Sequence, residues 1–89
     1  MNDTTMLEML KIDLGISTTA YDVRLEQYLE SAKEYIIREG INLDSEIVSD
    51  MNLVVMYAAW LWRKRDTAES MPRMLRWNLN NRLFAEKVN

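Results

Sequence analysis

The residue types that most often carry out chemistry in proteins are scarce in this chain. It contains neither cysteine nor histidine, so a thiol nucleophile, a histidine base and the commonest metal ligands are all missing. A serine nucleophile would need a nearby lysine or carboxylate, and no Ser-x-x-Lys motif occurs. The sequence therefore predicts a protein that is not an enzyme, with no catalytic residues, no metal site and no cofactor.

The most regular set of charged side chains is a row of glutamates at four-residue spacing, formed by Glu26, Glu30 and Glu34. Such spacing places the three carboxylates along one side of a helix. A catalytic carboxylate pair needs a concave, desolvated setting, and nothing in the sequence implies one. The row is interpreted as a solvated helix face that could also contact another protein.

The segment "MYAAWLWRKRD", residues 56–66, combines two tryptophans with three consecutive basic residues. The uncharged stretch that overlaps this segment, residues 51–62, is twelve residues long, whereas a membrane-spanning helix needs about 20. No membrane function is therefore expected. Basic and aromatic residues together can bind nucleic acid, but the chain carries a net charge of −3 and shows no recognition motif. The dipole of a helix also favours basic residues at its C-terminal end without any ligand.

Charge is divided unevenly along the chain. Residues 1–50 carry eleven acidic and four basic side chains, whereas residues 51–89 carry three acidic and seven basic ones. This division indicates either an oriented contact surface or two solvated faces of opposite sign on one monomer. The sequence leaves both interpretations open.

The length of the chain predicts one domain, spanning residues 1–89. Two glycines and one proline leave few turns, so long helices are favoured over a β-fold. We expect an all-α fold, a compact bundle of about four helices in which the first is short and the other three are longer. The predicted helices run from residue 3 or 4 to about 14, from 20 or 22 to 39, from a cap at Asp44, Ser45 or Ser49 to about 66, and from Pro72 onward. Gly15 and Gly40 are predicted to end the first two.

Apolar residues that recur every three or four positions predict which side chains form the core. The predicted core residues are Leu25, Leu29, Ala32, Ile36, Val55, Ala58 and Trp62. The third helix is apolar nearly all round, which is typical of a helix buried on both sides. Trp60 and Trp62 are therefore expected to contact different partners.

The chain has more apolar surface than one small bundle needs, so Trp60, Trp77 and Phe84 either belong to the core or contact another subunit or partner, and the sequence leaves both open. In the last helix Leu75, Leu79 and Leu83 form one stripe, and Met74, Trp77 and Phe84 form a second on the far side. Aromatic residues, methionine and arginine are enriched at interfaces. The candidate contact residues are Tyr57, Trp60, Lys64, Trp77 and Phe84, with Glu26, Glu30 and Glu34 as an acidic surface that Lys64 of a neighbouring subunit would meet.

The three basic residues that end the third helix are predicted to point in different directions, because successive residues are about 100° apart. Lys64 is expected on the side of Trp60 and Tyr57. Arg65 is expected near the core side, where it either snorkels or pairs with an acid such as Asp66 or one from the N-terminal half.

The pattern "LEMLKIDLGISTTAYDVRLEQYLESAKEYI", residues 7–36, resembles the start of the small head–tail connector (adaptor) proteins of tailed bacteriophages and prophages. The spacing of Asp22, Leu25, Leu29 and Ala32 carries this resemblance. The second half is also similar, with an apolar helix that bears Tyr57 and ends on Arg63 or Arg65, and a final helix that starts at "MP". The Trp-rich segments "WLWRKRD" and "RWNLNNRLF" depart from the pattern.

The resemblance implies an all-α virion protein at the head–tail junction, assembled in the cytoplasm of a bacterial host. It implies a homo-oligomeric ring below the portal that extends the DNA channel and docks the next tail-joining component. DNA would pass through without being read, and no catalysis is implied. The alternative that the residues leave open is a small helical DNA-binding or regulatory protein of a mobile element.

Overall fold

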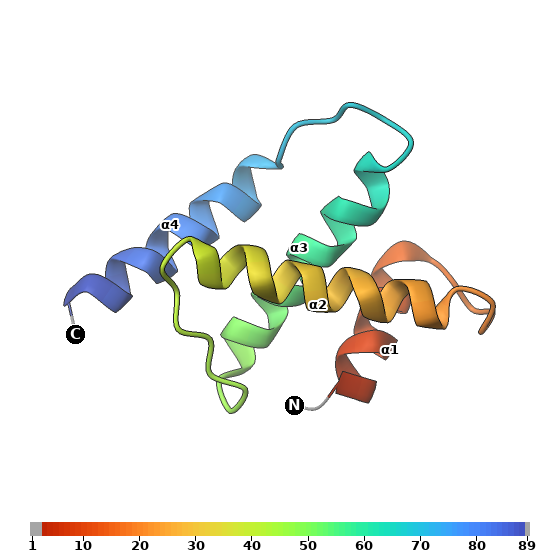
Figure 1. The fold of residues 1–89 in the computed structure, drawn as a ribbon, viewed down its shortest axis with the longest axis horizontal. Coiled ribbons are helices and arrows are strands. Elements are labelled where there is room, and N and C mark those ends of the chain that lie inside the picture. The colour runs from red at the N-terminus through yellow and green to blue at the C-terminus, as the bar shows by residue number, and fades with distance from the viewer. Residues whose placement is uncertain (1–2, 89) are drawn as a thin grey trace.

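The computed structural model describes residues 3–88 and contains four helices within that range. They are α1 (Asp3–Leu14), α2 (Asp22–Arg38), α3 (Val48–Lys64) and α4 (Arg73–Val88). No strand occurs among residues 3–88, and the predicted all-α bundle of one short and three longer helices is confirmed. Figure 1 shows α2 crossing in front of α3, with α4 joined to α3 by a loop that arches away from the bundle.

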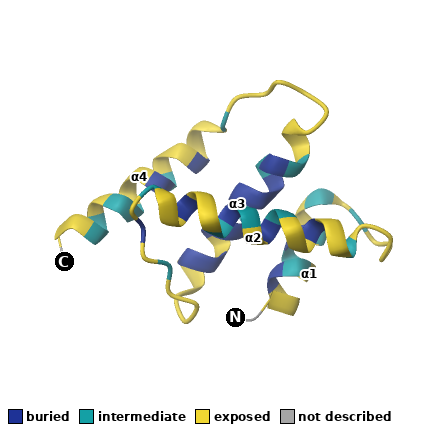
Figure 2. Ribbon diagram, viewed as in Figure 1, coloured by how far each residue is buried: buried dark blue, intermediate teal, exposed yellow. Residues whose placement is uncertain are grey.

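The core is built around α3, which contributes nine buried residues and is buried on more than one side, as its nearly uniform apolar character predicts. Helix α2 lies across it with a single buried stripe, at the three- and four-residue spacing predicted from the sequence. Helix α1 adds Met6 and Leu10, and α4 adds Leu75 and Leu79. In Figure 2 the buried positions line the inner sides of all four helices, whereas much of α4 is exposed. Every predicted core residue except Trp62 is buried.

Two glycines end the first two helices, as predicted. Gly15 has a φ of 71° and Gly40 a φ of 103°, a left-handed region that L-residues with a side chain rarely adopt. The amide of Ile16 donates a hydrogen bond to the carbonyl of Lys11, and the amide of Gly40 donates one to the carbonyl of Ile37. These bonds satisfy carbonyls that the helix itself leaves without partners.

The predicted cap of the third helix is wrong. Ile47 occupies the N-cap position of α3 and its side chain makes no capping hydrogen bond. Asp44 instead closes the preceding turn, because its side-chain oxygen accepts the amide of Glu46 at 2.9 Å. The Asp50 carboxylate accepts the amide of Asp44 at 3.0 Å, so a side chain from inside the helix helps to hold the loop.

Helix α4 carries apolar side chains on two opposite sides. Leu75 and Leu79 are buried against α3, and Leu83 packs at the edge of the core. On the far side, Met74, Trp77 and Phe84 are largely exposed, which confirms the predicted second stripe. No helix in the described part of the chain is long and apolar enough to cross a membrane.

Candidate interaction surfaces

An aromatic row with a cation at each end runs from α2 to the C-terminal half of α3. Tyr35 stacks on Tyr57 with ring centroids 5.8 Å apart, and Tyr57 meets Trp60 edge to face at 5.5 Å. The Lys64 ammonium lies 4.4 Å from the centre of the Trp60 ring, and the Arg38 guanidinium lies 5.9 Å from that of Tyr35. Lys64 therefore lies on the side of Trp60 and Tyr57, as predicted.

The middle of this row is packing between helices, whereas Tyr35, Arg38 and Lys64 towards its ends are exposed. Tyr57 is only 6% exposed, and burial, helped by the negative charge of Glu39, raises the pKa of its hydroxyl. Trp60 is half-buried, and its indole N–H is buried without a hydrogen-bond partner among the described residues. Tyr57 was a candidate contact residue, but its burial leaves almost none of the side chain for another protein to touch.

The second tryptophan of α3 lies in a separate aromatic cluster. Trp62 meets Tyr21 at 5.5 Å and Tyr28 at 5.8 Å, both edge to face. The Arg65 guanidinium lies 3.6 Å from the centre of its ring and 3.5 Å from the Asp66 carboxylate, as predicted for Arg65. The two tryptophans thus contact different partners, but the prediction that Trp62 lies inside the core is wrong. It is half-buried at the edge of the core, where Tyr28 of α2, Tyr21 at the start of α2 and Arg65 contact its ring.

The glutamate row lies on the exposed side of α2, opposite the buried stripe. Glu26, Glu30 and Glu34 are all exposed. Glu30 lies 3.2 Å from the Lys33 ammonium, which also contacts Asp3 at 3.1 Å. Partial burial lowers the pKa of Lys33, but the hydrogen bonds that its ammonium donates to Asp3 and Glu30 outweigh this effect, and the net pKa is raised. The interpretation of the row as a solvated face fits this placement.

The outer side of α4 is the largest run of exposed apolar side chains on one helix of the described chain. Trp77 is 62% exposed and Phe84 is 68% exposed, and both point away from the bundle. The exposed large apolar residues of this helix are Met74, Trp77, Phe84 and Val88. Of the five aromatic and basic residues proposed for an interface, Trp77 and Phe84 are therefore the most available to a partner.

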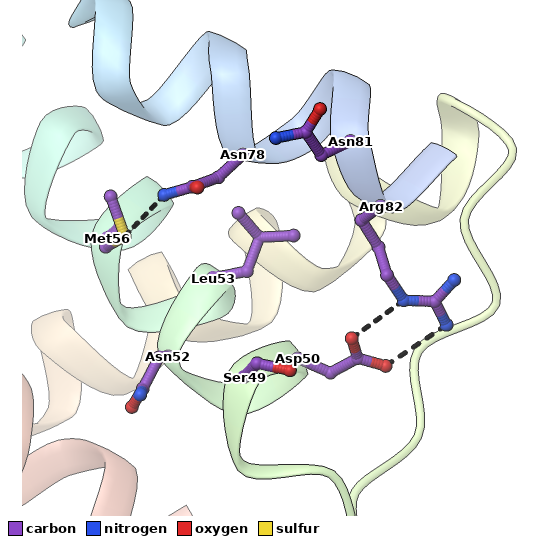
Figure 3. A pocket seen from close by; sticks show the side chains of 8 residues that line it. All are labelled: Ser49, Asp50, Asn52, Leu53, Met56, Asn78, Asn81 and Arg82. Carbon is purple, nitrogen blue, oxygen red and sulfur yellow. Dashed lines mark hydrogen bonds and ion pairs between the residues drawn. The ribbon is translucent and has the colours of Figure 1, made fainter. Parts of the chain in front are cut away.

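A buried ion pair joins α4 to the start of α3. The Arg82 guanidinium donates to both carboxylate oxygens of Asp50, at 2.8 and 3.2 Å, while Asp50 is 1% exposed (Figure 3). Arg82 also lies 2.7 Å from Glu86 and donates to the carbonyl of Asn42 at 2.8 Å. The hydrogen bonds that Arg82 donates to Asp50 are the main cause of the raised pKa of Arg82. These partners occupy the guanidinium of Arg82 within the bundle.

Sequence reasoning missed this network. Asp50 and Arg82 lie 32 residues apart, and no periodicity links them. The available signal was an acidic residue directly before the uncharged run of the third helix, since a carboxylate that is buried there requires a cationic partner.

The ion pair closes one end of a groove of about 470 Å³ between α3 and α4. Figure 3 shows Leu53 and Met56 along α3 and two asparagines of α4 above them. Asn78 makes a weak 3.7 Å contact from its amide nitrogen to the Met56 sulfur. The groove is lined by Ser49, Asp50, Asn52, Leu53, Met56, Asn78, Asn81 and Arg82. Its only charged groups already satisfy each other, and no cluster of three or more potential metal-ligating side chains occurs among residues 3–88.

Comparison with protein families gives a match over most of the chain. The model of the family described as "phage gp6-like head-tail connector protein" matches residues 4–83, which is most of the chain. No curated protein and no solved structure matches at a significant level. A connector of this family is a structural component of the phage particle. The matched range includes all of α2 and α3 and most of α1 and α4, so the resemblance seen in the sequence is confirmed, and the chain belongs to the phage gp6-like head–tail connector family.

Proposed function

We propose that this protein forms a homo-oligomeric ring below the portal of a tailed phage or prophage, at the head–tail junction of the virion. The ring extends the DNA channel and offers a docking surface to the next tail-joining component. The observation that carries the proposal is the family match over residues 4–83. The exposed apolar side of α4 supports it, because a monomer has no use for such a surface. In this proposal the protein performs no catalysis and needs no cofactor.

The proposed ring contact joins two different surfaces of neighbouring subunits. A contact between unlike patches can repeat around an axis until the ring closes. One patch is the acidic row Glu26, Glu30 and Glu34, and the other is the end of α3 that carries Trp60 and Lys64. Ion pairs at an exposed rim add only about 0–1 kcal/mol each, so charge sets the register while apolar contacts supply most of the affinity. Trp77 and Phe84 provide a further apolar surface on α4.

A charge exchange tests the ring contact in the presence of the portal. Glu34 has no ion-pair partner among the described residues, so Glu34→Lys should weaken ring formation on the portal without unfolding the monomer. Combining it with Lys64→Glu should restore assembly, measured by sedimentation and native mass spectrometry. Glu8→Lys, which changes an exposed acid on α1, is the matched control. Wild-type protein that never joins the portal would overturn the proposed function, whereas a swap without effect would overturn only this pairing of surfaces.

DNA is proposed to pass through the ring without sequence recognition. The acidic N-terminal half repels phosphate while the basic C-terminal half attracts it. A gel-shift titration should show weak binding at physiological salt and no preference among DNA sequences. Tight, site-specific binding with a steep dependence on salt would instead support the alternative, a small DNA-binding regulator of a mobile element.

A further inference from the structure

The exposed apolar residues of α4 follow the spacing of a two-stranded coiled coil. The stripe consists of the exposed apolar residues Met74, Trp77, Phe84 and Val88, with the polar Asn81 between Trp77 and Phe84. The spacing between successive members alternates between three and four residues. This is the a and d pattern of two heptads, with a single polar asparagine at the central a position. The stripe lies on the side of α4 opposite Leu75 and Leu79, which already face the core.

We propose that this outer stripe pairs with the same stripe of a second copy of the chain, with the two α4 helices parallel. The stripe is then a self-complementary surface, and residue 81 of one copy faces residue 81 of the other. An asparagine at a central a position favours this arrangement, because two facing carboxamides can hydrogen-bond across the axis. Asn81 is exposed and has no hydrogen-bond partner among residues 3–88 that would have to be broken.

The charges beside the stripe favour the parallel orientation over the antiparallel one. One flank carries Arg73 and Lys87, and the other carries Asn78 and Ala85. Parallel helices bring unlike flanks together, so each basic side chain faces neutral residues. Antiparallel helices would bring the two basic flanks together and place like charges opposite each other, which is unfavourable. Arg73 and Lys87 form no ion pair among the described residues that would neutralise them.

The size of the stripe predicts a weak dimer. An aromatic side chain buries about 150–250 Å² when fully covered, so the exposed parts of these four side chains amount to roughly 500 Å² per copy. A contact of roughly 1,000 Å² in total lies at the lower limit for specific association. We therefore expect dimers that form at high protein concentration and dissociate on dilution.

This contact is distinct from the one that closes a ring. It joins identical patches, so it is complete with two copies. It rests on the proposed function only in treating the outer side of α4 as an interface, and its test needs no portal. Failure of the dimer and failure of portal binding can therefore be told apart.

The first experiment measures the mass of the free protein by sedimentation over a hundredfold range of concentration. Wild-type protein should shift from monomer to dimer, and Trp77→Glu should remain monomeric with an unchanged circular dichroism spectrum. Ile12→Glu is the matched control, because Ile12 is exposed on α1 outside the stripe. A wild-type chain that stays monomeric throughout, or a Trp77→Glu variant that dimerises as well as wild type, would overturn the proposal.

The second experiment tests whether residue 81 of one copy faces residue 81 of the other, with a single introduced thiol, because the chain has no cysteine of its own. Under mild oxidation, Asn81→Cys should form a disulfide-linked dimer at least tenfold faster than Asn80→Cys. Residue 80 directly precedes residue 81 in the chain and is also exposed, but it lies on the flank of the stripe. Equal rates for the two variants would show that residue 81 does not face its counterpart.

Discussion

The guanidinium of Arg82 lies against both oxygens of the buried Asp50 carboxylate and ties the last helix to the beginning of the third. Leu75 and Leu79 of α4 are fully buried, and this ion pair adds a polar connection to their apolar packing. Arg76 adds a second connection to Glu39 after α2, at 2.8 and 3.1 Å, but this pair is more exposed. Both apolar packing and charge pairs therefore hold α4 in its position.

Loss of the Arg82 side chain should be strongly destabilising. Arg82→Met leaves the Asp50 carboxylate buried without its cation, and breaking a buried pair in this way costs about 3–5 kcal/mol. Because Arg82 itself is partly exposed, we expect about 3 kcal/mol in urea unfolding. Arg63→Met is the control, since Arg63 is exposed and makes no ion pair among the described residues, and it should change stability by less than about 0.5 kcal/mol.

The same pair can be tested by adding a second change. If the cost comes from the unpaired carboxylate, the double variant Asp50→Asn with Arg82→Met should be more stable than Arg82→Met alone. A double variant that is less stable than either single one would contradict this explanation.

Truncation of Trp62 should cost less than truncation of a core tryptophan. A fully buried tryptophan loses about 3–5 kcal/mol on substitution by alanine, whereas Trp62 is half-buried between Tyr21 and Tyr28. We expect Trp62→Ala to lower the free energy of unfolding by about 2 kcal/mol, measured by denaturant titration. Trp77→Ala, at an exposed tryptophan, should lower it by less than about 0.5 kcal/mol. Equal losses for the two variants would disprove this ranking.

The two glycines should differ in their tolerance of a side chain. Both have positive φ, and left-handed backbone costs an L-residue about 1–2 kcal/mol. A Cβ at Gly15 would meet nothing within 4 Å, whereas one at Gly40 would lie 3.3 Å from Leu83. Gly15→Ala should therefore lower the free energy of unfolding by about 1–2 kcal/mol in thermal or urea unfolding, and Gly40→Ala by more. A smaller loss at Gly40 than at Gly15 would contradict the structure at this turn.

Stability should fall at alkaline pH through Tyr57. Its pKa in the folded protein is raised above the ordinary 10.0, chiefly by burial. As pH rises, the unfolded chain loses this proton before the folded protein does, so the unfolded state binds fewer protons and is favoured. The contribution is fully present below about pH 10 and is lost above it.

Urea unfolding at successive pH values between neutral and strongly alkaline checks this direction. Tyr57→Phe should show a smaller loss of stability at high pH than wild type, because it has no proton to release. Tyr21→Phe, at a tyrosine that is 48% exposed, serves as the control and should follow wild type more closely. A Tyr57→Phe variant with an unchanged alkaline loss would contradict the assignment.

Much of the fold could be predicted from the sequence, because helices are local structures. The recurrence of Leu25, Leu29, Ala32 and Ile36 identifies the buried side of α2, since residues three and four apart share one side of a helix. Gly15 was predicted to end its helix by the same kind of local reasoning, because only glycine adopts its φ without strain. The exposed apolar stripe of α4 could be predicted for the same reason, because its residues recur at helical spacing on the side opposite the one that packs in the core.

What only the tertiary structure decided depends on how the helices cross. The pairing of Asp50 with Arg82, the burial of Tyr57 and the half-exposure of Trp62 each depend on which side chain another helix brings close. Periodicity gives the direction of a side chain about its own helix axis, but not the position of the next helix along or around that axis. The sequence alone therefore determined which sides of the helices are apolar, and the packing of the helices decided which of those sides remain open to a partner.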